Sequence, residues 1–202
     1  NIIDSLPKRE FLAGIPEIIK SGLIKRSNIL EELKKNHLAV KKRDFKVLKK
    51  IIYETLKTKI FFFKDDINEK KKRLILNFGH TFGHAIEMAT DKLILKDYLR
   101  HGEAVGLGML CEIYYSNPKE TKLLKSVVEL LNLYDLPTKI INRKTYKDLS
   151  KLQNEIFSCV FLDKKKIGKF PRFIFIKNKL KPSIKEIQNF NLLNITIKKF
   201  LI

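Results

Sequence analysis

Residues 77–87 carry the densest pattern in the chain and read Asn77-Phe78-Gly79-His80-Thr81-Phe82-Gly83-His84-Ala85-Ile86-Glu87. Two imidazoles stand four residues apart in a segment with helical periodicity, which places both on one face of a helix. That spacing is the usual way to present two ring nitrogens to one divalent ion. The two glycines remove side chains, so that backbone and substrate can approach closely. The alternative interpretation is a pair of histidines hydrogen-bonded in a core.

A second motif begins at residue 101 and reads His101-Gly102-Glu103-Ala104-Val105. Five of the eight glycines and three of the four histidines lie between residues 79 and 108. This concentration favours a metal site, although spacing does not decide which two histidines bind. The fourth histidine, His37, is interpreted as a surface residue.

Two further groups of charged residues lie outside this region. Glu17 and Lys20 stand three apart on an otherwise apolar helix, either as an ordinary ion pair or as a carboxylate ligand beside an ammonium group. Near the C-terminus, the run Asp163-Lys164-Lys165-Lys166 is a solvated charge run when it is taken alone.

The composition excludes several classes of protein. The chain has 202 residues, of which 44% are hydrophobic, and this is enough for one domain with a real core. Two cysteines, Cys111 and Cys159, rule out a disulfide scaffold and a four-cysteine zinc module, and indicate a reducing, cytoplasmic setting. No apolar run approaches the length of a membrane-spanning helix, so we expect no membrane partner.

The formal net charge is +20, from 42 Lys and Arg against 22 Asp and Glu. The lysines are spread from Lys8 to Lys199 with acidic residues among them, and no RNA-binding or zinc-finger motif accompanies them. We therefore expect no specific nucleic-acid partner. A basic field favours a small anionic substrate instead.

The periodicity predicts a mainly α-helical domain with one small β-hairpin near the C-terminus. The expected helices cover residues 9–23, 28–38, 45–63, 101–115, 119–133 and 147–157, the last being the final substantial helix, and residues 74–90 start apolar and become helical. Residues 171–176 and 181–187 are the expected strands. No glycine-rich fingerprint follows a strand, so we expect no dinucleotide-binding domain within residues 1–202.

Together, the two histidine motifs resemble the C-terminal domain of 3-dehydroquinate synthase very closely. The resemblance extends, in the same order, to Leu6-Pro7-Lys8-Arg9-Glu10, to Gly14-Ile15-Pro16-Glu17-Ile18-Ile19-Lys20 and to Asp163-Lys164-Lys165. It covers nearly the whole chain, from about residue 2 to residue 176. The chain departs from the family in the loop before Arg73, and at Pro16, where the family usually has alanine.

The resemblance implies a role for particular residues. The ligands of a catalytic Zn²⁺ or Co²⁺ would be Glu17, His80 and His101, while His84 would face the substrate. The substrate-binding positions would be Lys20, Lys59, Arg73 and Asn77, with Lys164 or Lys165 toward the phosphate. Ile2, Ile3, Asp4 and Ser5 would make an edge contact to NAD.

The family reaction converts 3-deoxy-arabino-heptulosonate 7-phosphate into 3-dehydroquinate and phosphate, a step of the shikimate pathway. The resemblance implies an NAD-dependent lyase that works with a separate N-terminal NAD-binding domain, and a homodimer in the complete enzyme. Two alternatives stay open. One is another sugar-phosphate cyclase of the same superfamily, and the other is a non-enzymatic chain, either a truncated metal-binding helical domain or a basic nucleic-acid module.

Overall fold

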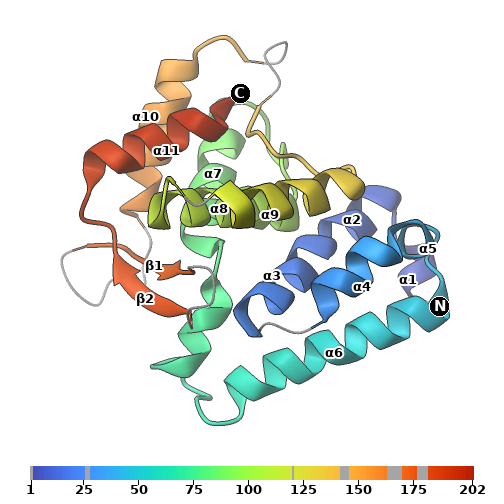
Figure 1. The fold of residues 1–202 in the computed structure, drawn as a ribbon. Helices are drawn as coiled ribbons and strands as arrows, with labels where there is room; N and C mark the ends of the chain where they lie inside the picture. Colours follow the sequence, from blue (N-terminus) through green and yellow to red (C-terminus); the bar gives the residue numbers. More distant parts are fainter. Residues whose placement is uncertain (1, 26–27, 120, 142–145, 163–169, 177–181) are drawn as a thin grey trace.

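The structure is a computed structural model, and it describes residues 2–25, 28–119, 121–141, 146–162, 170–176 and 182–202. Helices form most of it. These residues contain eleven α-helices, one short 3₁₀ helix and a single two-stranded sheet (Figure 1). The predicted fold class, a mainly α domain with a hairpin near the C-terminus, is confirmed.

The N-terminal segment is broken where the sequence predicted one helix over residues 9–23. After α1 (Ile2–Ser5), the chain forms α2 (Lys8–Ala13) and then α3 (Ile15–Lys25). Pro16 has no backbone N–H, and its ring would clash with the carbonyl four residues earlier in a continuous helix. The break therefore falls at Gly14, and α3 starts anew immediately before the proline.

Three helices follow on the side of the molecule that carries the N-terminus. The predicted helix over residues 28–38 is also divided, into α4 (Ile29–Lys35) and α5 (His37–Lys41). The long α6 (Phe45–Phe63) matches its predicted bounds. The side chain of Asp44 caps it by accepting a hydrogen bond from the Val47 amide at 3.0 Å.

The centre of the molecule is built on two helices in very close contact. A 3₁₀ turn, η1 (Lys72–Asn77), leads into α7 (His80–Leu93), which packs on α8 (His101–Ser116). A Cβ atom at Gly108 would overlap the carbonyl oxygen of Gly79, and one at Gly83 would lie 3.1 Å from the carbonyl oxygen of Ala104. Glycine is required at these positions because the two backbones nearly touch.

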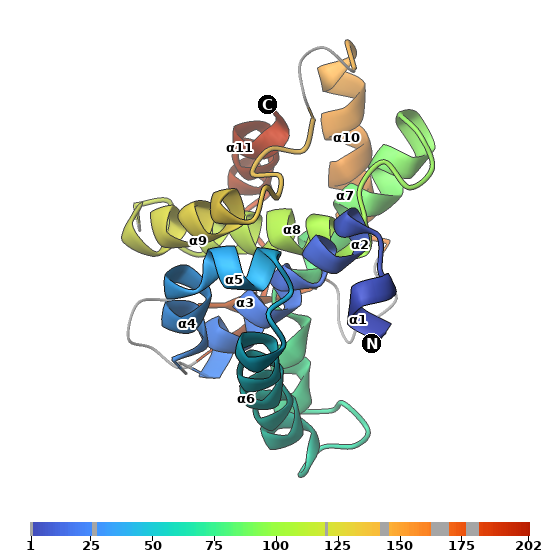
Figure 2. The ribbon, with the colours of Figure 1, turned by 90° about the vertical axis from the view of Figure 1, so that its right-hand side faces the viewer.

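The C-terminal part holds the remaining helices, namely α9 (Thr121–Leu133), α10 (Leu149–Val160) and α11 (Phe190–Leu201). The expectation that residues 147–157 form the last substantial helix is wrong. Leu193, Ile197 and Phe200 repeat at helical spacing and are buried in α11, and Asn189 caps that helix at the Leu192 amide. Figure 2 shows α10 and α11 on the same side of α8.

The hairpin consists of β1 (Arg172–Phe175) and β2 (Ser183–Glu186). The strands are antiparallel, with Arg172 opposite Glu186 and Ile174 opposite Ile184. Phe173 and Ile174 are buried, and β1 packs on α8 and α7. The predicted strands are confirmed, while the predicted turn at Asn178-Lys179 lies outside the described residues.

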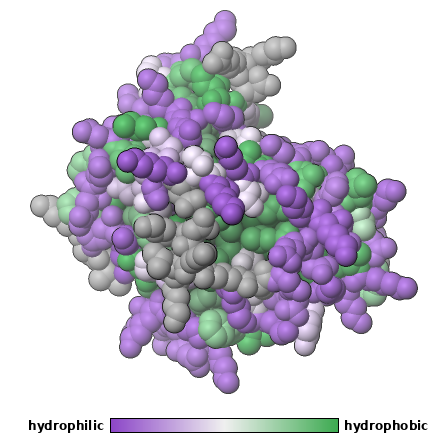
Figure 3. Space-filling model, in the orientation of Figure 1, coloured by the Kyte–Doolittle hydropathy of each residue, from purple (hydrophilic) through white to green (hydrophobic). Residues whose placement is uncertain are grey.

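Hydrophilic side chains cover most of the face seen in Figure 3, with smaller apolar areas between them. Within the described residues, no helix is both long enough and apolar enough to cross a membrane.

Candidate metal and substrate site

The start of α7 presents the first two histidines. Gly79, the residue before the helix, has a φ angle of 82°, a left-handed conformation that glycine adopts without strain. His80 follows as the first helical residue, and its Nδ1 lies 3.2 Å from the carbonyl oxygen of Phe78. A hydrogen bond donated from Nδ1 leaves Nε2 unprotonated and able to bind a metal.

Three imidazoles meet at this point. The ring centres of His80 and His84 are 5.3 Å apart, and those of His80 and His101 are 5.4 Å apart. One ring nitrogen from each of His80, His84 and His101 lies within 4.8 Å of the others. The predicted helical pair is thus joined by a third histidine from α8, and the group could hold a metal ion.

In the His-Gly-Glu motif, the glycine and the glutamate have structural roles in the packing of α8 on the N-terminal helices. A Cβ atom at Gly102 would overlap the carbonyl oxygen of Ala13, at the end of α2. Glu103 accepts a hydrogen bond from the Arg100 amide at 2.8 Å, and both its oxygens accept from the Arg9 guanidinium at 2.9 and 2.6 Å. These contacts fix the start of α8, and with it His101, against the N-terminal helices.

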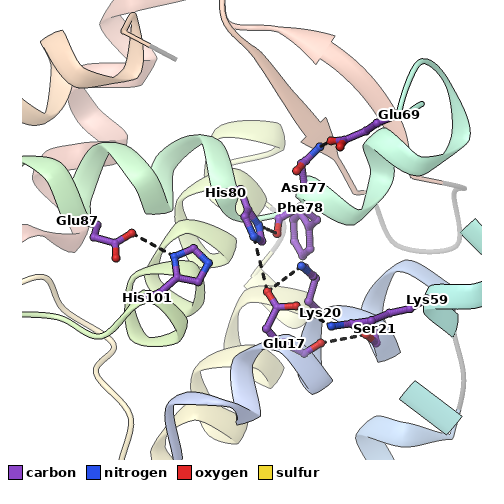
Figure 4. A network of polar contacts seen from close by, with 10 residues as sticks. All are labelled: Glu17, Lys20, Ser21, Lys59, Glu69, Asn77, Phe78, His80, Glu87 and His101. Atoms are coloured by element: carbon purple, nitrogen blue, oxygen red, sulfur yellow. Dashed lines mark hydrogen bonds and ion pairs between the residues drawn. The ribbon is translucent and has the colours of Figure 1, made fainter. Parts of the chain in front are cut away.

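Glu87 lies one helical turn beyond His84 and contacts the third histidine. Its Oε2 is 3.1 Å from Nδ1 of His101 (Figure 4). A carboxylate on one ring nitrogen fixes the tautomer and raises the basicity of the other, as carboxylates do for metal-binding histidines. Glu87 is therefore placed to turn Nε2 of His101 into a metal ligand.

The Glu17 carboxylate, on α3, forms the centre of a second group of charges (Figure 4). Its Oε1 is 2.8 Å from Lys20 Nζ and 3.7 Å from His80 Nε2, and its Oε2 is 3.4 Å from Lys59 Nζ on α6. Glu17 thus touches His80, but it is not part of the three-histidine group. The structure joins the two groups through His80.

Burial governs the protonation of this cluster. Desolvation, reinforced by the nearby Lys20, lowers the pKa of His80 to about 4, so that the imidazole is neutral at pH 7. Burial acts to raise the pKa of Glu17, but Lys20 and His80 outweigh it and the net pKa is lowered. Desolvation also lowers the pKa of Lys20, whose side chain is almost completely buried. A neutral imidazole beside a carboxylate is the protonation state that metal binding needs.

Two hollows adjoin the cluster and share His80 and Asn77. One is a cleft of about 200 Å³, and its wall includes the proposed substrate residues Lys20, Lys59, Arg73 and Asn77 together with Glu17 and His80. The other is a pocket of about 40 Å³ between the start of α7 and β1, reached by His84 and Arg172. Six of the nominated residues therefore line one cleft rather than scattering with the other lysines, whereas His84 lines only the small pocket and His101 lines neither hollow.

The loop before Arg73 is shaped by the two acidic residues that precede it. Asp66 accepts hydrogen bonds from the amides of Lys70, Lys71 and Arg73 at 2.7 to 2.9 Å. Glu69 accepts one from the Asn77 side chain at 2.6 Å and lies 3.9 Å from the Arg73 guanidinium. This loop holds Arg73 and Asn77 at the edge of the cleft.

Some nominated residues lie elsewhere. Lys164 and Lys165 are outside the described residues. Ile2, Ile3, Asp4 and Ser5 form α1 and line neither hollow; the carbonyl oxygens of Ile3 and Asp4 accept hydrogen bonds from Arg43. The sequence motifs indicate neither Arg172 nor Glu112. Glu112 is a fully buried carboxyl on α8, and its place in an otherwise apolar stretch of that helix is the signal that could have revealed it.

Comparison with known proteins shows the family to which the chain belongs. The family model described as 3-dehydroquinate synthase C-terminal matches residues 14–166. Among curated relatives, a 3-dehydroquinate synthase of Dictyoglomus thermophilum is 43% identical over 112 residues, covering 55% of this chain and 30% of that protein. One of Chlorobium chlorochromatii is 31% identical over 181 residues, covering 86% of this chain and 47% of that protein. The chain thus spans less than half the length of these relatives.

Solved structures share the fold. A 2-epi-5-epi-valiolone synthase from Streptomyces hygroscopicus, with NAD⁺ and Zn²⁺ bound, has a TM-score of 0.75 at 17% identity, covering 98% of this chain and 53% of that one. A 2-deoxy-scyllo-inosose synthase complexed with carbaglucose-6-phosphate, NAD⁺ and Co²⁺ has a TM-score of 0.71 at 24% identity, covering 98% and 54%. The fold is that of a sugar-phosphate cyclase C-terminal domain. Within that class, the chain belongs to the 3-dehydroquinate synthase C-terminal family.

Proposed function

We propose that this chain is the metal- and substrate-binding part of a 3-dehydroquinate synthase, which forms 3-dehydroquinate and phosphate from 3-deoxy-arabino-heptulosonate 7-phosphate. The observation that carries the proposal is a single cleft in which metal donors and cationic side chains meet. Glu17 contacts His80 at 3.7 Å, and Lys20, Lys59 and Arg73 line the same cleft. A substrate with both a carboxylate and a phosphate needs this combination of charges.

The donor atoms fit a divalent ion such as Zn²⁺ or Co²⁺. Imidazole nitrogens and a carboxylate oxygen are the ligands of catalytic zinc sites, and the Nδ1 atoms of His80 and His101 already have oxygen partners. We infer that His80 and His101 bind through Nε2 and that Glu17 supplies the carboxylate, with His84 facing the substrate. When bound, the ion would polarise the substrate's hydroxyl and ketone oxygens as a Lewis acid.

The other residues of the cleft have separable tasks. The planar guanidinium of Arg73 can bind both oxygens of the substrate carboxylate at once. The ammonium groups of Lys20 and Lys59 stabilise negative charge that develops on the substrate, and the burial of Lys20 strengthens this effect because water does not screen it. Asn77 orients a substrate hydroxyl, and Lys164 or Lys165 binds the phosphate.

The hydride acceptor belongs to another part of the enzyme. The described residues contain no glycine-rich loop of the kind that holds the phosphates of a dinucleotide. The solved relatives bind NAD⁺ and are about twice as long as this chain. We therefore propose that an N-terminal NAD-binding domain supplies the cofactor, that Ile2–Ser5 make at most an edge contact with it, and that the complete enzyme is a cytoplasmic homodimer.

Another sugar-phosphate cyclase activity is the second candidate, because two such enzymes share the fold at TM-scores of 0.75 and 0.71. The substrates of the two candidate activities differ in one chemical group that the residues of the cleft could distinguish. The heptulosonate phosphate carries a carboxylate, whereas glucose 6-phosphate, which carbaglucose-6-phosphate resembles, carries none. Arg73 at the edge of the cleft favours the substrate with the carboxylate.

The test is an assay of phosphate release in the presence of Zn²⁺ and NAD⁺. The 202-residue chain and a form extended at its amino end by an NAD-binding domain are each given the heptulosonate phosphate or glucose 6-phosphate. We expect release by the extended form with the heptulosonate phosphate only, and none by the short chain. Preference for glucose 6-phosphate would support the second candidate, and turnover by the short chain would contradict the proposed division between the two domains.

A further inference from the structure

Glu112 is a carboxyl group with no exposed surface in the middle of α8. Burial raises its pKa to about 8, while the backbone N–H groups of Gly79, Ile174 and Thr81 act in the opposite direction. Placing such a group in a core is costly unless hydrogen bonds compensate for the lost water. One such bond is present, from the Ile174 amide to Oε2 of Glu112 at 3.2 Å, whereas Oε1 has no hydrogen-bond partner among the described residues. The position of Glu112 therefore needs a structural reason.

The first reason lies at the free edge of β1. Ile187 donates its amide to the carbonyl of Pro171, so residues 171 and 187 form a hydrogen-bonded pair of the antiparallel ladder. Because such pairs alternate, the backbone groups of Arg172 and Ile174 point away from β2. Instead of a third strand, two helices satisfy this edge. Thr81 Oγ1 donates to the Arg172 carbonyl at 2.7 Å, and the Ile174 amide donates to Glu112 Oε2 at 3.2 Å.

The second reason lies at the start of α7. The first amides of a helix have no partner within the helix, and Gly79 has no side chain with which to cap them. The amides of Gly79 and Thr81 lie near enough to Glu112 to act on its pKa in the lowering direction, although no hydrogen bond reaches the Oε1 atom of Glu112 within the described residues. The absence of a side chain at Gly108, one turn earlier on α8, lets the two helices approach closely enough for this.

We propose that Glu112 is a positioning residue that joins the start of α7 and the edge of β1 to α8. By joining these segments, Glu112 sets the position of His80 relative to β1. Both contribute to the walls of the small pocket that His84 and Arg172 also line. As far as metal binding is concerned, this inference rests on the proposed function, because it takes His80 as a ligand. The joining of the three segments itself is independent of the activity.

The test compares Glu112→Leu, which keeps the volume but removes both oxygens, with Glu112→Gln, which keeps an acceptor. Ile113→Val, a small change at the next buried position of α8, is the matched control. Two properties of the 202-residue chain are measured. One is the affinity for Co²⁺, followed by its visible absorption, and the other is the hydrogen exchange of the Gly79, Thr81 and Ile174 amides.

We expect Glu112→Leu to weaken Co²⁺ binding by about tenfold or more, in the range seen when a residue that orients a metal ligand is lost. The three amides should exchange faster in this variant. Glu112→Gln should restore both properties, and Ile113→Val should change neither. If the position needed only an apolar side chain and no acceptor, the order would be reversed, because leucine buries no polar group and glutamine buries an amide.

Wild-type affinity and wild-type exchange in Glu112→Leu would overturn the proposal. If that variant does not fold, the exchange of the wild-type Ile174 amide decides, since an edge amide without an acceptor exchanges rapidly and one held by Glu112 is protected. If the wild-type chain binds no Co²⁺ at all, the proposed function fails. The hydrogen-exchange measurements still test whether Glu112 holds α7 and β1 against α8.

Discussion

The carboxylate of Glu17 and the imidazole of His80 face each other across α3 and α7, with Oε1 3.7 Å from Nε2. The same oxygen is held by Lys20 Nζ at 2.8 Å. A metal ion bound to this oxygen of Glu17 would therefore either displace the buried ammonium group of Lys20 or share the oxygen with it. Metal affinity and the charge of Lys20 should consequently be coupled.

The choice of metal ligands can be decided by three single variants. If Glu17, His80 and His101 bind the ion, Glu17→Gln and His101→Ala should each weaken Zn²⁺ binding strongly, because a ligand is lost. His84→Ala should retain the metal and lower kcat/KM in the complete enzyme. Titration calorimetry with Zn²⁺ measures the affinities. Loss of metal in His84→Ala with retention in Glu17→Gln would instead identify the three histidines as the ligand set.

Replacement of Glu87 should weaken metal binding through His101. Glu87→Gln removes the negative charge that lies 3.1 Å from Nδ1 of His101, and we expect an affinity loss of about tenfold. Glu54→Gln, which removes one partner of the ion pair with Lys57 on α6, is the matched control and should leave the affinity unchanged. Equal affinities for all three proteins would show that Glu87 does not tune His101.

Gly102 should tolerate no side chain. In Gly102→Ala, the new Cβ would overlap the backbone oxygen of Ala13, so α8 and α2 must separate. We expect a loss of roughly 3 kcal/mol or more in the free energy of unfolding, by analogy with overpacked cores. Gly106→Ala is the control on the same helix, because its nearest neighbours, 3.2 to 3.6 Å away, are side-chain atoms of Leu131 and Pro16. Urea unfolding of both variants measures the difference.

The stability of the metal-free protein should fall as the pH rises from 6.5 to 8. Burial raises the pKa of Glu112 from 4.5 to about 8, so in this range the folded state binds a proton that the unfolded state has lost. The free energy of unfolding should then decrease by about 1.4 kcal/mol per pH unit from this group. His80 opposes this slope near pH 6.5, because its pKa is lowered from 6.5 to about 4 and only the unfolded state still binds part of a proton there. This opposing contribution is the smaller of the two and fades as the pH rises further.

The control for this pH dependence is Glu112→Gln, which does not titrate. Its free energy of unfolding should change less than that of the wild type between pH 6.5 and 8. Parallel curves for the two proteins would mean that Glu112 has an ordinary pKa in the folded state. Urea unfolding at a series of pH values, with a chelator present, provides both curves.

Arg73→Lys in the complete enzyme should impair substrate capture more than turnover. Lysine keeps the charge but lacks the planar fork that binds two carboxylate oxygens. We expect KM to rise so that kcat/KM falls by about tenfold, which corresponds to about 1.4 kcal/mol. Steady-state kinetics with the heptulosonate phosphate measure both constants, and an unchanged kcat/KM would remove Arg73 from the site.

Local sequence pattern sufficed for much of the fold and for the composition of the site. The helix over residues 45–63 has its predicted bounds, because apolar residues recur at helical intervals along it and Asp44 can cap it. The two histidine motifs contain Asn77 and His80 of the cleft, while Lys20, Lys59 and Arg73 were nominated by the family resemblance. Such features depend on neighbours along the chain, which is why the pattern alone reveals them. The helix over residues 190–201 has the same kind of pattern, so the prediction that the last substantial helix ends at residue 157 did not use all of the signal in the sequence.

Tertiary structure alone decided how the parts meet. Spacing could not reveal that Glu17 faces His80, that Glu87 contacts His101, or that Glu112 joins the edge of β1 to α8. Periodicity records which face of a helix is buried, but not which other face covers it. Close approach of two backbones, as at Gly102 and Gly108, depends on packing between segments that are distant in sequence. Such packing also brings His101 of α8 near His80 and His84 of α7.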